Sequence, residues 1–158
     1  MNKELMAYLG LEAKVSAAFN FFINGMISAL IYHKTDLVPV DYISLAIDLI
    51  LTCLLMFILT ALFSTASLRR TNTIGILPQG NNAIRKLSRL FRRPVLFGLL
   101  MGMATAAFLF VLTAPALALI GVKNLSFGTY IALKATGCAL LGGTVTMTAL
   151  YLGLFRVE

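Results

Sequence analysis

Two oppositely charged side chains, Asp48 and Lys134, lie inside apolar stretches of this 158-residue chain. A charge at the centre of a bilayer costs roughly 2.5–3.5 kcal/mol on insertion scales, so each residue needs a partner or a function. A membrane-embedded aspartate can carry a proton, bind a cation or pair with a base. We predict an Asp48–Lys134 ion pair between two helices. Two alternatives stay open: a transport role for Asp48, and side chains that reach the membrane surface.

Further polar side chains recur at four-residue spacing in the first apolar stretch. On a helix this spacing forms one slowly drifting line. Asparagine is costly to expose to lipid, so the line should face protein. Two roles fit it: binding of a polar solute or ion, and hydrogen bonding between helices, which we prefer. Together with one threonine of the second stretch, the candidate residues are Asn20, Asn24, Ser28 and Thr52.

The sequence contains no motif for enzymatic chemistry. His33 is the only histidine, which excludes a histidine-based metal cluster. There is no His-Glu-x-x-His motif, no phosphate loop and no nucleophile beside a base. Cys53 and Cys138 lie in apolar stretches and form no Cys-x-x-Cys pair. We therefore expect no enzyme, no metal and no cofactor.

The composition is that of a membrane protein. Hydrophobic residues make up 59% of the chain and charged residues 12%, whereas soluble domains average roughly 45–50% and ~25%. The length accommodates four spanning helices without a separate soluble domain. We predict an all-α integral membrane protein in which Asp41 and Ser126 cap two of the helices. Residues 1–158 form one membrane domain with spans at residues 15–32, 42–64, 94–120 and 126–155.

A basic segment at residues 69–93 divides the four spans into two hairpins. A loop over residues 71–80 precedes an expected amphipathic helix over residues 81–91, which would lie on anionic lipid headgroups. The alternative is a simple stop-transfer cluster of charges. Because the basic residues flank spans, the net charge of +7 indicates anionic lipid and not nucleic acid. The expected lipid-facing residues are Arg85, Lys86, Arg89, Arg92 and Arg93.

The distribution of basic residues predicts the orientation. The central segment, the N-terminal tail and Arg156 carry most of them, whereas the opposite loops contain only Lys34 and Lys123. The positive-inside rule then places both termini and the central segment in the cytoplasm. Residues 1–14 lack the features of a cleavable signal and are expected to form an interfacial helix or a frayed tail. Because the chain is short and carries no targeting signal, we expect the plasma (inner) membrane of a bacterium.

The two halves of the chain resemble each other. Residues 25–29 (GMISA) are similar to residues 102–106 (GMATA). An alignment that lays Thr60 on Thr146 also matches the two intramembrane charges. Because each half has an even number of spans, this repeat would be parallel and not inverted. Chance similarity between apolar helices is the alternative.

Small residues form ridges in the third and fourth spans. Such ridges let a second backbone approach closely. On a lone bundle they would be exposed, which favours a homodimer or a partner membrane protein. The packing residues are Gly98, Gly102, Gly142 and Gly143.

Two functions from different classes fit these features. The first is a transporter or channel subunit for a small solute or ion, with Asp48 and Lys134 as gating or coupling charges. The second is a non-enzymatic membrane scaffold or accessory subunit that binds a partner protein or anionic lipid. A polar cavity between the first, second and fourth spans would favour transport, and a close-packed centre would favour the scaffold.

Overall fold

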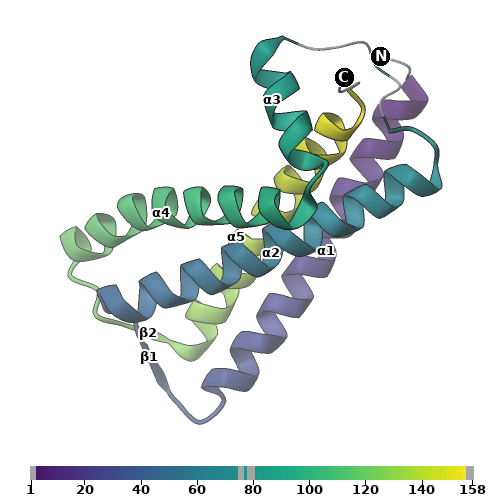
Figure 1. Ribbon diagram of the computed structural model, residues 1–158. Helices are drawn as coiled ribbons and strands as arrows, with labels where there is room; N and C mark the ends of the chain where they lie inside the picture. The colour runs from purple at the N-terminus through teal and green to yellow at the C-terminus, as the bar shows by residue number, and fades with distance from the viewer. Residues whose placement is uncertain (1–2, 75–76, 78–80, 156–158) are drawn as a thin grey trace.

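A computed structural model describes residues 3–74, Leu77 and residues 81–155 (Figure 1). Within these residues the chain forms five helices and one two-stranded ribbon. Four of the helices are long and apolar enough to span a membrane, which confirms the prediction of an all-helical chain with four such helices. The elements are α1 (Lys3–Tyr32), β1 (Leu37–Pro39), α2 (Tyr42–Arg70), α3 (Asn82–Phe91), α4 (Pro94–Ile120), β2 (Asn124–Ser126) and α5 (Phe127–Gly153).

Two helices are longer than the predicted spans. α1 runs unbroken from Lys3 through residues 3–14, a stretch rich in strong helix formers that was expected to form an interfacial segment. α2 continues past residue 64 to Arg70 and buries Leu68 in a core at that end. The third span agrees at both ends with α4. Half of the predicted loop over residues 71–80, and Arg156, lie outside the described residues.

The helix ends follow local sequence signals. Ser126 caps α5 by accepting a hydrogen bond from the backbone N–H of Thr129 (3.3 Å), and Asp41 caps α2 in the same manner. α4 ends at Ile120 and is capped by Gly121, whose φ of 72° lies in the left-handed region that glycine adopts readily. Both predicted caps are therefore present.

Asp41 makes the start of α2 sensitive to pH. The Ser44 hydroxyl and the backbone N–H groups of Ser44 and Ile43 donate hydrogen bonds to its carboxylate, which lowers the pKa of Asp41 below its usual 3.8. A lowered folded-state pKa stabilises the fold above the unfolded-state pKa, and this contribution is lost as the pH falls through the folded-state pKa. We expect protection of the Ile43 and Ser44 amides against hydrogen exchange to fall below about pH 4.

The control for this prediction is Asp41→Asn. Asparagine caps helices about as well as aspartate but does not titrate in this range. Amide protection in the variant should therefore stay constant relative to unfolded-chain exchange rates between pH 6 and pH 3. An equal loss of protection in both proteins would show that another group is responsible.

Strands β1 and β2 form a short antiparallel ribbon that the sequence did not predict. Val38, which is fully buried, lies opposite Leu125 at its centre. Pro39 is the last residue of β1, where a proline is tolerated because both strands are edge strands. The ribbon joins the two loops and holds the starts of α2 and α5 near each other (Figure 1).

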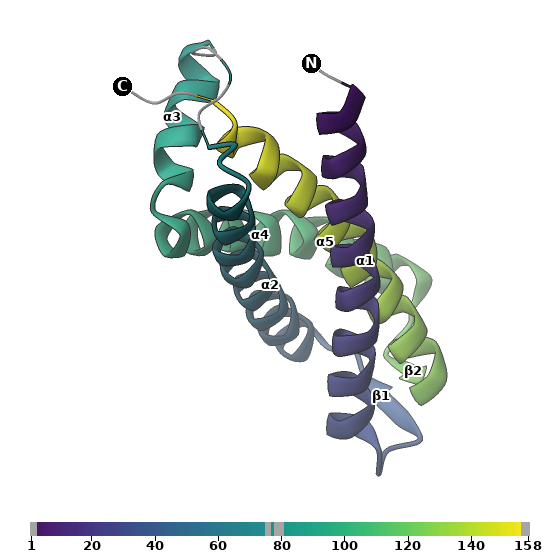
Figure 2. The same cartoon turned by 90° about the vertical axis from the view of Figure 1, so that its right-hand side faces the viewer.

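Helix packing crosses the two halves of the chain. α1 packs mainly on α5, α2 packs mainly on α4, and α2 and α5 meet between the two pairs (Figures 1 and 2). The predicted arrangement as two hairpins is thus not confirmed. α1 and α2 follow each other in the chain but diverge, and Figure 2 shows part of α5 between them.

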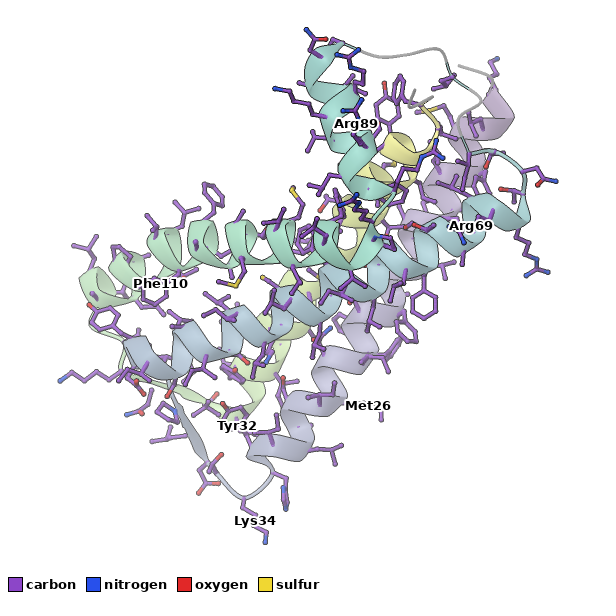
Figure 3. The ribbon with its side chains drawn as sticks, in the orientation of Figure 1. Met26, Tyr32, Lys34, Arg69, Arg89 and Phe110 are labelled. Atoms are coloured by element: carbon purple, nitrogen blue, oxygen red, sulfur yellow. The ribbon has the colours of Figure 1, made fainter. Side chains whose placement is uncertain are left out.

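The main hydrophobic core lies at the end of the molecule that carries α3, here called the basic end. The rings of Phe91 and Phe97 stack edge to face there, with centroids 5.5 Å apart. Figure 3 shows Arg69 and Arg89 at this end, and Lys34 at the opposite end beside the β1–β2 ribbon, here called the ribbon end. The buried core residues are Leu9, Ala61, Leu68, Phe91, Phe97, Ala149, Leu150, Leu152 and Leu154.

The glycine ridges are used inside the chain. Gly98 and Gly102 are buried against α2, and a Cβ added at Gly98 would lie 2.6 Å from the Ile58 Cα. Gly142 and Gly143 face α1 in the same way. Because these ridges are already covered by helices of the same chain, they no longer give a reason to expect a homodimer.

Candidate functional site

A groove with a volume of about 480 Å³ lies between α1 and α2, with α5 as its floor. This volume is within the range of roughly 300–1,000 Å³ that small-molecule sites occupy. The groove runs from the basic end towards the middle of the molecule. About half of its lining residues are polar or charged: Glu12, Ser16, Asn20, Thr60, Ser64, Ser67, Arg70 and Thr146.

The α1 side of the groove is held to α5 by hydrogen bonds. The Thr146 hydroxyl donates to Ser16 Oγ (2.6 Å), and Ser16 Oγ donates to the Gly142 carbonyl (3.3 Å). The Asn20 amide donates to the Ser16 carbonyl (2.9 Å). Gly142 makes this approach feasible, because any Cβ at that position would meet the Asn20 side chain. These bonds fix the positions of the polar groups along the groove.

The α2 side offers unused hydroxyl groups. Thr60 and Ser64 are largely buried, line the groove and make no side-chain hydrogen bond to any residue that the structure describes. A hydroxyl in this position can donate to or accept from a bound molecule. The groove therefore has one wall with satisfied polar groups and one wall with groups available to a ligand.

The mouth of the groove at the basic end carries one acid and one base. Glu12 comes from α1 and Arg70 from α2. Ser67 Oγ donates a hydrogen bond to Glu12 Oε1 (3.4 Å) and is also bonded to the hydroxyl of Tyr8. Arg70 is exposed, and within the described part of the chain it has no hydrogen-bond or ion-pair partner.

Asp48 and Lys134 meet beyond the inner end of the groove, towards the ribbon end. Lys134 Nζ on α5 forms an ion pair and a hydrogen bond with Asp48 Oδ1 on α2, as the alignment of the two halves predicts. The Lys134 side chain is 11% exposed and that of Asp48 26%. Along α2, Asp48 is about 12 Å from Met56, the innermost α2 residue of the groove, at ~1.5 Å per residue.

Aromatic rings accompany the ion pair. Lys134 Nζ lies 5.8 Å from the centroid of the Tyr130 ring, a distance at which a cation is attracted to an aromatic face. The Tyr130 ring in turn contacts Tyr32 of α1 edge to face, with centroids 5.1 Å apart. α1, α2 and α5 are thus linked at the ribbon end. The groove lies between α1 and α2 towards the other end, where the hydrogen bonds of Ser67 to Tyr8 and Glu12 join the two helices.

Only part of the predicted polar line belongs to the groove. Asn20 lines it, and Asn24 donates to the Asn20 carbonyl (3.0 Å) from outside it. Ser28 is fully buried, and its hydroxyl has no hydrogen-bond partner among the described residues. Thr52 is partly exposed on α2 and does not line the groove. The line therefore serves mostly contacts within and between helices.

The sequence reasoning missed the residues at the mouth. Ser67 follows Thr60 and Ser64 at helical spacing on α2, but it lies beyond residue 64, where the predicted second span ends. Glu12 lies within residues 1–14, for which the sequence predicts an interfacial helix or a frayed tail. Extending the two spans by two turns would have placed Glu12, Ser67 and Arg70 on the helices that line the groove.

The basic residues of α3 and the turn after it lie apart from the groove. α3 buries Ser88 and Phe91 against the core, and its basic side chains are exposed. Arg92 donates from Nη2 to the Phe155 carbonyl at 3.5 Å. The exposed residues on this surface are Arg85, Lys86, Arg89, Arg92 and Arg93.

Comparison of the chain with protein-family models, with curated proteins and with solved structures found no match. Among the described residues, no three or more His, Cys, Asp or Glu side chains gather where they could hold a metal ion. The groove and the ion pair are therefore the features from which a function can be argued.

Proposed function

We propose that this protein is a small membrane carrier that admits its substrate to the groove between α1, α2 and α5. The observation that carries this proposal is the groove itself, in which polar side chains interrupt a mainly apolar lining within helices of membrane-spanning length. A polar surface is costly to maintain inside a membrane without a partner. A purely structural centre would be expected to pack closely, as α2 packs on α4.

In this proposal the Asp48–Lys134 pair closes the path beyond the groove. The two charges attract each other strongly in a medium of low dielectric constant, which favours contact between α2 and α5. Their position beyond the innermost groove residues, with Tyr130 beside them, suits a gate. Separation of the pair would connect the groove with the ribbon end.

A parallel two-fold repeat accounts for the packing of the helices. Exchange of the two halves turns the α1–α5 contact into the α4–α2 contact and leaves the α2–α5 and β1–β2 contacts unchanged. The offset of 86 residues between Asp48 and Lys134 is within one residue of that between the caps Asp41 and Ser126. The sequence alignment and the helix packing thus support the same relation.

The groove departs from this two-fold relation. Its counterpart would lie between α4 and α5, but that side is filled by an apolar cluster in which Phe57 and Val145 are buried and Met101 packs against them. On the groove side, α1 presents the small polar residues Ser16 and Asn20. A difference in side-chain volume and polarity on an otherwise similar framework favours a specific role for the groove.

We assign the basic end to the cytoplasm. The exposed basic residues of α3 and the C-terminal end of α2 gather there, whereas the ribbon end has Lys34 and Lys123 together with Asp36 and Asp41. α3 then lies at the headgroups of an anionic leaflet. A bacterial inner membrane fits this orientation, and the groove opens to the cytoplasmic side.

Thiol labelling tests whether the groove is open to water. Cys53→Ala and Cys138→Ala remove the native thiols, and Ser64→Cys then places one thiol in the groove. We expect a membrane-impermeant thiol reagent to label Ser64→Cys in inside-out vesicles and not in right-side-out vesicles. Thr65→Cys is the matched control, because Thr65 is also buried and adjacent but does not line the groove.

The same assay tests the gate. Adding Asp48→Asn removes one charge of the pair, and Ser64→Cys should then be labelled from both sides. If Ser64→Cys reacts no faster than Thr65→Cys from either side, the centre is closed to water and the carrier proposal fails. The scaffold alternative, which the close packing of α2 on α4 and the cationic surface of α3 favour, would then be preferred.

A further inference from the structure

The groove opens sideways to the bilayer as well as at the basic end. Its rims carry large apolar side chains that are exposed although they border a polar site: Val15 and Phe19 on α1, Leu59 and Phe63 on α2. Phe19 is 57% exposed and Phe63 65%. Exposed apolar residues on spanning helices contact lipid acyl chains. A molecule in the groove is therefore in contact with the bilayer.

Polar side chains from three helices also line the groove. The hydroxyls of Thr60 and Ser64 are unpaired among the described residues, and the hydrogen-bonded Ser16 and Thr146 line the same groove. A polar strip behind apolar rims suits a molecule with a polar part inside the groove and acyl chains in the bilayer. A membrane amphiphile has both of these parts.

The mouth indicates the charge of its headgroup. Ser67 donates a hydrogen bond to Oε1 of Glu12, while Oε2 of Glu12 has no partner among the described residues. The Arg70 guanidinium also has no partner among these residues. A carboxylate accepts hydrogen bonds from an ammonium group, and a guanidinium binds phosphate through two parallel bonds. One acid and one base at the same mouth are complementary to a headgroup that carries both charges.

We infer that the groove binds a zwitterionic phospholipid with a primary ammonium group, of the phosphatidylethanolamine type. Its phosphate lies at Arg70, its ammonium at Glu12, and its acyl chains extend over the rims at Phe19 and Phe63. A choline headgroup has no N–H group to donate to Glu12. An anionic headgroup without an amine is repelled by the same carboxylate. This assignment names the substrate class of the carrier proposed above and rests on that proposal.

Tryptophan fluorescence gives a direct test, because the chain contains no tryptophan. Phe63→Trp places the reporter on the rim. Leu62→Trp is the control, since Leu62 is adjacent on α2, 41% exposed and outside the groove lining. Each variant is reconstituted into vesicles with a small fraction of phospholipid that has brominated acyl chains, which quench nearby tryptophan. The brominated lipid carries either an ethanolamine or a choline headgroup.

We expect Phe63→Trp to be quenched preferentially by the ethanolamine lipid. A preference of about three- to fivefold corresponds to one exposed ion pair. Leu62→Trp should be quenched equally by both lipids, because it samples only bulk lipid. Equal quenching at Phe63→Trp, or the same preference at Leu62→Trp, would overturn the assignment.

Charge variants then identify the two contacts. Glu12→Gln keeps an acceptor for Ser67 but removes the charge, so the headgroup preference at Phe63→Trp should disappear. Arg70→Gln should weaken binding of both lipids by the same factor, because both contain the phosphate. A preference that survives Glu12→Gln would rule out Glu12 as the ammonium site.

The lipid assignment and the carrier can fail separately. A headgroup preference at Phe63→Trp combined with an unreactive Ser64→Cys would leave a lipid site without a carrier, and the substrate assignment would be wrong. A reactive Ser64→Cys without any headgroup preference would keep the carrier and reject this lipid as its substrate.

Discussion

Gly98→Ala should lower the free energy of unfolding by about 1–3 kcal/mol, the usual effect of overpacking a close contact. An added Cβ would lie 2.6 Å from the Ile58 Cα and 2.8 Å from its backbone nitrogen. Backbone atoms cannot rotate away as a side chain does, so α4 and α2 must separate. That separation would also loosen the contact of Gly102 with the α2 backbone.

The matched control is Gly137→Ala on α5, where nothing lies within 4 Å of an added Cβ. Alanine is a better helix former than glycine, so this change should stabilise the protein by up to about 1 kcal/mol. Thermal unfolding in detergent, followed by circular dichroism, compares the two variants. Gly98 lies on α4, which does not line the groove, so Gly98→Ala should leave the labelling of Ser64→Cys unchanged. A shift in the same direction for both variants would contradict the close-contact argument.

The parts of the fold that the sequence predicted are those that depend on local chemistry. Long apolar stretches without charges define spanning helices because each backbone polar group must be satisfied within lipid. Asp41 and Ser126 were identified as caps because short polar side chains before an apolar helix satisfy its first N–H groups. Pro94 begins α4 because a proline fits the first turn.

Helix partners were harder to predict. Between apolar helices in lipid there is no hydrophobic driving force that selects one face, since lipid tails are as apolar as leucine. Connectivity suggested hairpins, but the glycines decide the contacts: Gly98 fits α2 and Gly142 fits α1. A small-residue ridge shows that a backbone comes close and does not show which one.

The candidate site was predicted in part for the same reason. Asp48 and Lys134 were paired from the sequence because an intramembrane charge requires compensation and only one opposite charge lay at a similar depth. Thr60 and Ser64 follow each other at four-residue spacing in the sequence, but this spacing does not reveal an open space beside them. The ribbon escaped notice because β1 and β2 have only three residues each, too few for an alternating pattern to be visible.

Breaking the Asp48–Lys134 pair should have a large effect, and a double-mutant cycle measures it. Asp48→Asn leaves the lysine without its counter-ion, and Lys134→Met leaves the aspartate. Removing one partner of a buried pair costs about 3–5 kcal/mol. The pair is partly exposed, since the Asp48 side chain is 26% exposed and that of Lys134 11%. We therefore expect each single variant to lower the free energy of unfolding by about 1–3 kcal/mol.

The double variant distinguishes a pair from two separate charges. Asn and Met together leave no uncompensated charge, so the double variant should recover much of the loss, with a coupling free energy of about 0.5–3 kcal/mol. Thermal unfolding in detergent gives all the values. Additive losses would mean that each charge acts alone, and Asp48 would then be an unpaired membrane acid to be examined by proton- and cation-flux assays.

A coupling free energy between Asp48 and Lys134 allows two interpretations, which the labelling assay distinguishes. If the double variant is stable and Ser64→Cys reacts from both sides, the pair is a gate. If it is stable and Ser64→Cys still reacts only from inside-out vesicles, the pair holds α2 against α5 and the path is closed by packing around Tyr130 instead.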